Sequence, residues 1–255
     1  MIVSNGIQAV LLVGGKGTRL RSVLPSTPKP LALLGDKTFL ELLVCQLKCQ
    51  GIRRLVMCTG YLADHIENEF VDGSKWGVEI AYSREPHALG TGGALKLAQP
   101  HLSASAPFLM LNGDSFLQMD FDDLIRFHRT HRGVATIAVR RVDGAGRYGS
   151  VEVAGDGQVV GFREKTDASV PGIVNGGVYA FSPAIFDYIP EGQVSLEREV
   201  FPRLTGNGLY AREQQGIFID IGIPEDYARA QAACEKLFRA ARETSPQRTL
   251  ELGGR

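Results

Sequence analysis

The sequence lacks a net charge, a long hydrophobic run and any targeting pattern. Its 28 basic residues balance 28 acidic residues. A balanced chain has no overall field to gather nucleic acid or an anionic membrane, so any anion site must be local. The N-terminal apolar run, residues 7–13, is too short to span a bilayer and follows no basic segment. We therefore expect a soluble, cytoplasmic protein without nucleic-acid or membrane partners.

The cysteines lack the spacing of a metal finger or a disulfide framework. Cys45, Cys49, Cys58 and Cys234 form no C-x-x-C pair, and no histidine cluster lies beside them. Cys45 and Cys49 are four residues apart in an apolar helical segment, where cysteine is typically a small core residue. This usage favours a reducing compartment. A hexapeptide repeat is also missing, which removes one route to trimers and otherwise leaves a homo-oligomer open.

What the sequence does contain is an alternation of apolar strands and helical segments. The unbroken apolar run at 7–13 ends at glycines, which is typical of a strand buried on both faces. Further strands are expected at 55–59, 78–82, 108–111 and 135–139. Helices are expected at 39–50, 63–70, 92–98 and 121–132. The alternation predicts a mostly parallel sheet covered by helices.

The second half of the chain has shorter, more β-rich segments. We expect a hairpin at 150–163, strands at 177–181, 209–212 and 217–221, and a last helix that begins at Pro224. The polar residues 243–255 lack periodicity and are expected to fray. The prediction is one Rossmann-like α/β domain over 1–242, with a central mixed, mostly parallel sheet flanked by helices and a smaller β-rich part.

The sharpest local feature is the glycine-rich segment 14–19, GGKGTR, directly after the first strand. Glycines let backbone N–H groups approach an anion, and the two cations neutralise phosphate charge. A Walker A loop would need glycine where Val10 stands and Ser or Thr at Gly17, and a dinucleotide fingerprint would need Gly or Ala at Leu20. At the C-terminal end of a parallel strand, the segment predicts a phosphate-binding loop of another kind.

Pro28 and Pro30 enclose Lys29 in a second candidate phosphate contact. Flanking prolines favour an extended backbone and restrict where the lysine points. A lysine held in this way suits a point contact to phosphate.

These segments resemble the signature of the sugar-1-phosphate nucleotidyltransferase (NDP-sugar pyrophosphorylase) superfamily. After GGKGTRL and PKP, the motifs LGTGGA, NGD, REK, NGG and IDIG follow in order, and the resemblance covers residues 7–235. Within the superfamily the chain is most similar to D-glycero-α-D-manno-heptose 1-phosphate guanylyltransferases. The resemblance implies transfer of a nucleoside monophosphate from GTP to heptose 1-phosphate, giving a nucleotide sugar for polysaccharide biosynthesis and pyrophosphate, with Mg²⁺.

The resemblance also implies a role for individual residues. Arg19 would contact the outer phosphates, Lys29 the α-phosphate, and Asp114 and Asp220 the metal. The remaining nucleotide-binding residues would be Gly14, Gly15, Gly17, Thr18, Gly90 and Thr91. The sugar-phosphate-binding residues would be Gly149, Glu164, Lys165 and Asn175.

Two of these assignments can also be argued from the residues themselves. Asp114 follows an apolar strand at the edge where ligands bind, and Asp220 interrupts an apolar strand, where an unpaired charge is costly. Glu85 lies five residues before Gly90, and its carboxylate could accept the N1–H and N2–H donors of guanine. Asp120 and Asp122, by contrast, precede a helix and are typical of N-terminal capping.

Other functions stay open from the sequence. Within the class, the chain could be a mannose 1-phosphate guanylyltransferase or a uridylyl- or cytidylyltransferase. A glycosyltransferase of similar core is disfavoured because Asp114 is followed by Ser115 and Phe116, which lack the second aspartate of a D-x-D motif. A non-catalytic nucleotide-sugar sensor would be marked by loss of Arg19, Lys29, Asp114 or Asp220, and all four are present.

Overall fold

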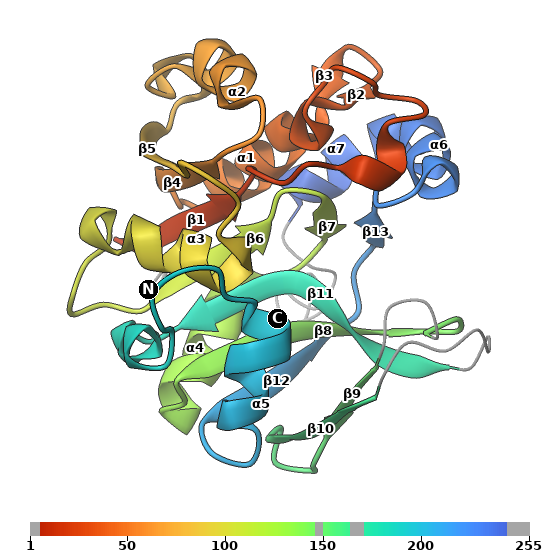
Figure 1. The fold of residues 1–255 in the computed structure, drawn as a ribbon. Helices are drawn as coiled ribbons and strands as arrows, with labels where there is room; N and C mark the ends of the chain where they lie inside the picture. Colours follow the sequence, from red (N-terminus) through yellow and green to blue (C-terminus); the bar gives the residue numbers. More distant parts are fainter. Residues whose placement is uncertain (1–5, 146–149, 164–170, 244–255) are drawn as a thin grey trace, which may run out of the picture.

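A mixed sheet of seven strands forms the centre of the protein (Figure 1). The computed structural model describes residues 6–145, 150–163 and 171–243. In spatial order the strands are β12 (Leu209–Gln214), β8 (Ala135–Val142), β11 (Gly172–Phe181), β6 (Phe108–Asn112), β1 (Gln8–Leu12), β4 (Arg54–Thr59) and β5 (Glu79–Arg84). Strand β11 is antiparallel to both of its neighbours, and the other four neighbouring pairs are parallel. The predicted mixed, mostly parallel sheet is confirmed.

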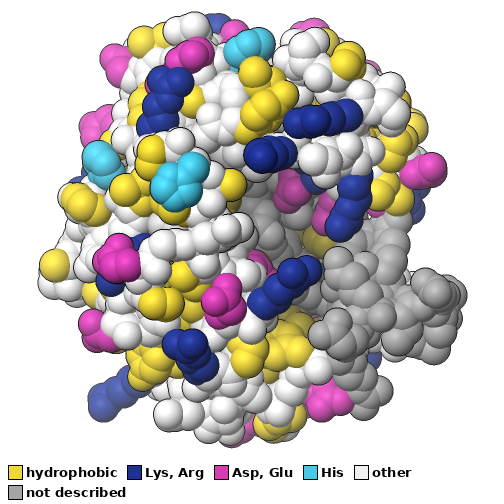
Figure 2. Space-filling model, in the orientation of Figure 1, with side chains coloured by type: hydrophobic (Ala, Val, Ile, Leu, Met, Phe, Trp, Pro, Cys, Tyr) yellow, Lys and Arg dark blue, Asp and Glu magenta, His cyan; other side chains and the backbone are white. Residues whose placement is uncertain are grey.

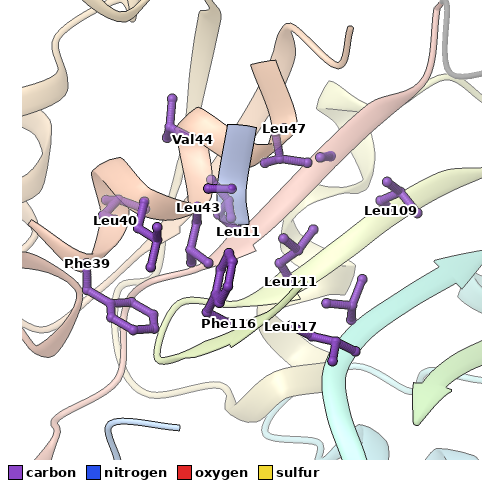
Figure 3. Close-up of a cluster of buried hydrophobic side chains, with 14 of the residues drawn as sticks. Leu11, Phe39, Leu40, Leu43, Val44, Leu47, Leu109, Leu111, Phe116 and Leu117 are labelled. Carbon is purple, nitrogen blue, oxygen red and sulfur yellow. The ribbon is translucent and has the colours of Figure 1, made fainter. Parts of the chain in front are cut away.

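Helices cover both faces of this sheet. They are α1 (Phe39–Cys49), α2 (Ala63–Phe70), α3 (Gly90–Ala98), α4 (Phe121–His131), α5 (Phe201–Leu204), α6 (Pro224–Ala232) and α7 (Cys234–Arg242). Because side chains alternate along a strand, Ala9 and Leu11 of β1 join one core cluster while Val10 joins the other. Figure 3 shows the first cluster, in which Leu43 of α1 faces Leu11 and Leu111 of the sheet. The buried first strand is thereby fixed on both sides.

Local sequence signals set where the helices begin. Thr38 caps α1: its hydroxyl accepts the backbone N–H of Glu41 at 3.2 Å, and the Glu41 carboxylate accepts the Thr38 N–H at 3.3 Å. Asp120 caps α4 by accepting the N–H groups of Asp122 and Asp123 at 2.9 and 3.3 Å. The predicted capping role is confirmed for Asp120, whereas Asp122 lies inside the first turn.

The C-terminal helical segment departs from prediction. The continuous helix expected from Pro224 is divided into α6 and α7, with Ala233 between them. The division turns α7 so that Leu237 and Phe238 bury their side chains in the core shared with α1. Helix α7 ends at Arg242, and residues 244–255 lie outside the described part of the chain.

Three small antiparallel pairs complete the fold. The shortest joins β2 (Leu33–Leu34) to β3 (Lys37–Thr38). Strands β9 (Ser150–Val153) and β10 (Val159–Arg163) form the predicted hairpin. Strand β7 (Ser115–Leu117), which was not predicted, pairs with β13 (Phe218–Asp220) and sets Asp220 opposite Ser115. Within the described ranges, no helix has the length and apolar character needed to cross a bilayer.

Candidate active site

A cavity of about 790 Å³ opens at the C-terminal ends of three parallel strands. Leu12 of β1, Cys58 of β4 and Asn112 of β6 form its floor. This is the edge at which open α/β sheets bind ligands, and the volume suits a nucleotide-sized molecule. Figure 2 shows a hollow on this face, with Lys, Arg, Asp and Glu side chains around it.

The cavity collects the predicted nucleotide and metal residues from segments far apart in the sequence. Its walls include Gly14, Gly15, Gly17, Thr18, Arg19, Lys29, Glu85, Gly90, Thr91, Asp114 and Asp220. Of the predicted sugar-phosphate residues, Gly149, Glu164 and Lys165 lie outside the described residues. Asn175 is described, and it lies behind the wall in contact with Tyr179.

The glycine-rich loop is anchored at both ends and open in the middle. Val13 donates its N–H to the Cys58 carbonyl at 3.0 Å, and the Leu20 side chain is buried in the core. A Cβ at Gly14 would lie 2.7 Å from Glu85 Oε1 and 2.9 Å from the Gly60 nitrogen, so the fold itself requires glycine there. A Cβ at Gly15 would meet nothing within 4 Å. The backbone of Gly15 therefore lines the cavity without a neighbouring atom that covers it.

Cationic side chains border the cavity beyond this loop. Lys16 and Arg19 are exposed, and neither has a hydrogen bond or ion pair to another described residue. Lys29 is nearly buried, with 12% of its side chain exposed. The flanking prolines predicted an extended backbone at Lys29, and this prediction is wrong. Lys29–Leu31 form a 3₁₀ turn, in which Pro30 needs no N–H donor.

Lys29 lies beside the two predicted metal-binding carboxylates. Its Nζ is 2.5 Å from Asp114 Oδ2. The β7–β13 pair brings Asp220 next to this ion pair, and Ile221 donates its N–H to the Asp114 carbonyl at 2.9 Å. A Cβ at Gly222 would lie 2.7 Å from Asp220 Oδ1 and 3.7 Å from Lys29 Nζ. The lysine ammonium and both carboxylates thus gather at one side of the cavity.

This carboxylate pair fits a small divalent ion that also contacts phosphate. Mg²⁺ usually takes one or two protein carboxylates and completes its shell with water and phosphate oxygens. Within the described part of the chain, no group of three or more His, Cys, Asp or Glu side chains is arranged to hold a metal. Asp114 and Asp220 are a pair, so an ion that they hold would need its remaining ligands from phosphate and water.

Glu85 is a fixed part of the wall rather than a surface glutamate. Its Oε2 accepts the Leu89 N–H at 2.8 Å, and its Oε1 faces Gly14 and Gly60. Burial raises the pKa of Glu85, and the hydrogen bond from Leu89 opposes this shift. One carboxylate oxygen therefore holds the loop 85–89, while the other faces the glycine-rich loop across the cavity wall.

The N-terminus of α3 reaches the cavity through Gly90 and Thr91. Gly90 has φ +73°, and a Cβ there would lie 2.5 Å from the Val194 carbonyl oxygen. The Thr91 hydroxyl donates to Glu197 Oε2 at 2.8 Å and accepts the Leu196 N–H at 2.9 Å. Thr91 therefore lines the cavity while its hydroxyl is bound to the segment 194–197.

Sequence reasoning missed a polar network behind the cavity. The Tyr179 hydroxyl donates to Glu197 Oε1 at 3.3 Å and accepts Asn175 Nδ2 at 2.8 Å, and the Asn112 side chain also binds it. Tyr179 is fully buried, and this burial raises its pKa well above the usual range. Asn112 and Asn175 stand in the NGD and NGG motifs, whereas Glu197 lies in a segment with no such signal.

Comparison with known proteins agrees with this geometry. The chain matches the family described as Nucleotidyl transferase over residues 8–236. It is 38% identical over 96% of its length to mannose-1-phosphate guanylyltransferase catalytic subunit beta of Drosophila pseudoobscura pseudoobscura, and covers 66% of that protein. The chain thus spans about two thirds of the length of the curated relatives that it matches.

Two solved structures are similar over almost their whole length. HddC from Yersinia pseudotuberculosis is 35% identical, with a TM-score of 0.80, and the match covers 90% of this chain and 99% of HddC. HddC complexed with GMP-PN matches with the same identity and coverage and a TM-score of 0.79. These structures confirm the predicted α/β fold, and the family match confirms the resemblance drawn from the motifs.

Proposed function

Because the chain belongs to the nucleotidyl transferase family, we propose that it transfers a nucleoside monophosphate from a nucleoside triphosphate to a sugar 1-phosphate and releases pyrophosphate. The preferred nucleotide in this proposal is GTP, and the acceptor is D-glycero-α-D-manno-heptose 1-phosphate. The observation that carries the proposal is the single cavity in which a bare glycine loop, Lys16, Arg19, Lys29 and two carboxylates meet at the strand ends.

The chemistry needs charge control and alignment rather than a covalent nucleophile. An oxygen of the sugar phosphate attacks the α-phosphorus, a new P–O bond forms, and the bond to the pyrophosphate oxygen breaks. Both reactants are anions, so the cations must lower their repulsion and hold them in line. In this proposal Arg19 contacts the outer phosphates and Lys29 the reacting α-phosphate, and the support is that the exposed Arg19 and the nearly buried Lys29 line the same cavity.

Mg²⁺ belongs to the same proposal. Asp114 and Asp220 would hold it, and it would supply charge neutralisation to phosphate oxygens when bound. The ion pair with Lys29 compensates part of the negative charge of Asp114.

Glu85 supports the choice of guanine. Guanine presents adjacent N–H donors on its Watson–Crick edge, and a carboxylate is a pure acceptor. Glu85 Oε1 faces the cavity wall beside Gly14, where a base above the glycine loop would lie. The curated relatives are named as guanylyltransferases, and HddC was solved with GMP-PN. Uridylyl or cytidylyl transfer is correspondingly disfavoured.

Two acceptors have separate support. The sequence motifs favour the heptose 1-phosphate, whereas the names of the curated relatives favour mannose 1-phosphate. A matrix of four nucleoside triphosphates against several sugar 1-phosphates, with Mg²⁺ and scored by pyrophosphate release, separates them. We expect release with GTP and the heptose phosphate; release with mannose phosphate alone would select the second acceptor. If no combination released pyrophosphate but the protein bound a preformed nucleotide sugar, the sensor function would be favoured instead.

A cytoplasmic location completes the proposal. Its support is that Cys45, Cys49, Cys58 and Cys234 are all free thiols, as in a reducing compartment.

A further inference from the structure

The polar network behind the cavity is centred on one carboxylate. Glu197 lies in a π-helical turn (Leu196–Val200) that packs beside α3. Its two oxygens serve different partners. Oε2 accepts the hydroxyls of Thr91 and Ser195 at 2.8 and 3.1 Å, and Oε1 accepts the hydroxyl of Tyr179 at 3.3 Å. The carboxylate therefore joins α3 to β11.

The first arm of this network leads to the nucleotide half of the cavity. Thr91 is fixed from both sides, because it donates to Glu197 and accepts the N–H of Leu196 at 2.9 Å. Thr91 also lines the cavity at the start of α3. Its place, and that of the helix N-terminus, thus depends on the Glu197 carboxylate.

The second arm leads to the predicted sugar half. A hydroxyl has one proton, and that of Tyr179 goes to Glu197, so its oxygen is left to accept from the amides of Asn175 and Asn112. Asn175 stands at an irregularity in β11 between Asn175 and Val178, and its Oδ1 accepts the Gly177 N–H at 2.9 Å. Such bulges re-aim side chains at sites. Each amide is thereby held with its nitrogen toward Tyr179.

We propose that Glu197 is a positioning residue for both half-sites at once: it fixes Thr91 in the nucleotide wall and, through Tyr179, the predicted sugar-binding residue Asn175. This inference rests on the proposed function, since the two half-sites are defined by its two substrates. Removal of the central acceptor would release Thr91 in one direction and both amides in the other. A buried network of this kind loses more than one hydrogen bond when its centre is changed.

The test separates the two arms kinetically. Thr91→Val should raise the KM for the triphosphate about tenfold and leave the KM for the sugar phosphate within about twofold, the size of one lost hydrogen bond. Tyr179→Phe, which keeps the buried ring, should show the reverse pattern. Glu197→Gln should raise both values, because it removes the charge that strengthens the hydrogen bonds of both arms and leaves one acceptor oxygen where the carboxylate has two. In the Thr91→Val/Tyr179→Phe background, Glu197→Gln should add little further loss.

Glu199 supplies a matched control. It lies on the same turn, is exposed, and accepts the Ser195 N–H at 2.8 Å without reaching the cavity. Glu199→Gln should leave both KM values unchanged. A purely structural role for Glu197 would instead lower the Tm and leave the two KM values of each variant moving together, and that result would overturn the inference. If the unaltered protein releases pyrophosphate but the arms do not separate, only this inference fails; if it releases none, the proposed function fails.

Discussion

At the scale of single residues, the acid pair carries the sharpest prediction. Asp114→Asn and Asp220→Asn should each lower kcat by at least about 100-fold, because each removes a charge that would neutralise the reacting phosphates. The loss should be measured as pyrophosphate release at saturating Mg²⁺. Asp64→Asn changes a surface carboxylate paired with Arg84 and serves as the control. Near-normal turnover in either site variant would remove that residue from the metal site.

The pKa of Glu85 gives a second prediction at this scale. Burial raises this pKa, so the carboxyl becomes protonated above the usual Glu value of about 4.3 as the pH falls. A protonated carboxyl loses acceptor capacity toward guanine. The KM for GTP should therefore rise as the pH falls through the raised pKa, while Glu85→Gln should have a higher KM that is flat over the same range. Steady-state kinetics at a series of pH values checks this, and parallel curves for both proteins would contradict it.

Single residues also show where sequence reasoning stops. The glycines, Arg19 and the two aspartates could be placed in one site because each follows a recognisable strand end or motif. The partners of Thr91 and Lys29 could not, because Glu197 and Asp114 lie 106 and 85 residues away along the chain. Distances of this kind depend on tertiary packing, about which local patterns carry no information.

At the scale of elements, the loop between β1 and the 3₁₀ turn Thr18–Leu20 contains one glycine that the fold needs, Gly14, and one that is expected to serve triphosphate binding, Gly15. Gly14→Ala would press a Cβ against Glu85 and Gly60 and should cost about 1–3 kcal/mol of unfolding free energy. Gly15→Ala meets only open space, so its cost should stay within about 0.5 kcal/mol, yet it should weaken triphosphate binding. Denaturant unfolding and calorimetric titration measure the two effects. Equal loss of stability in both variants would contradict this division.

The elements that periodicity reveals are those that the structure confirms. The apolar runs that became β1, β4 and β6 and the helices α1 and α2 could be placed to within a few residues. Strand β7 is only three residues long, and its pairing with β13 joins segments about 100 residues apart, so no local signal marks it. That pair nevertheless brings Asp220 to Asp114. The element that assembles the acid pair was therefore not visible in the sequence.

At the scale of the whole molecule, ligand binding should stabilise the fold through the β7–β13 pair, which brings Asp220 to Asp114. The cavity takes residues from the first half of the chain and Asp220 from the end of the sheet region, so a triphosphate with Mg²⁺ would tie both together. A ligand that binds only the native state at 100 times its Kd adds about 2.7 kcal/mol, which for a chain of this size is about 5–10 °C in Tm. Thermal unfolding with GTP and Mg²⁺ should show this shift. In Asp220→Asn, GTP with a chelator should still raise the Tm, but Mg²⁺ should add no further rise. Asp64→Asn should show both rises. If Mg²⁺ added its full rise in Asp220→Asn, the ion would bind elsewhere.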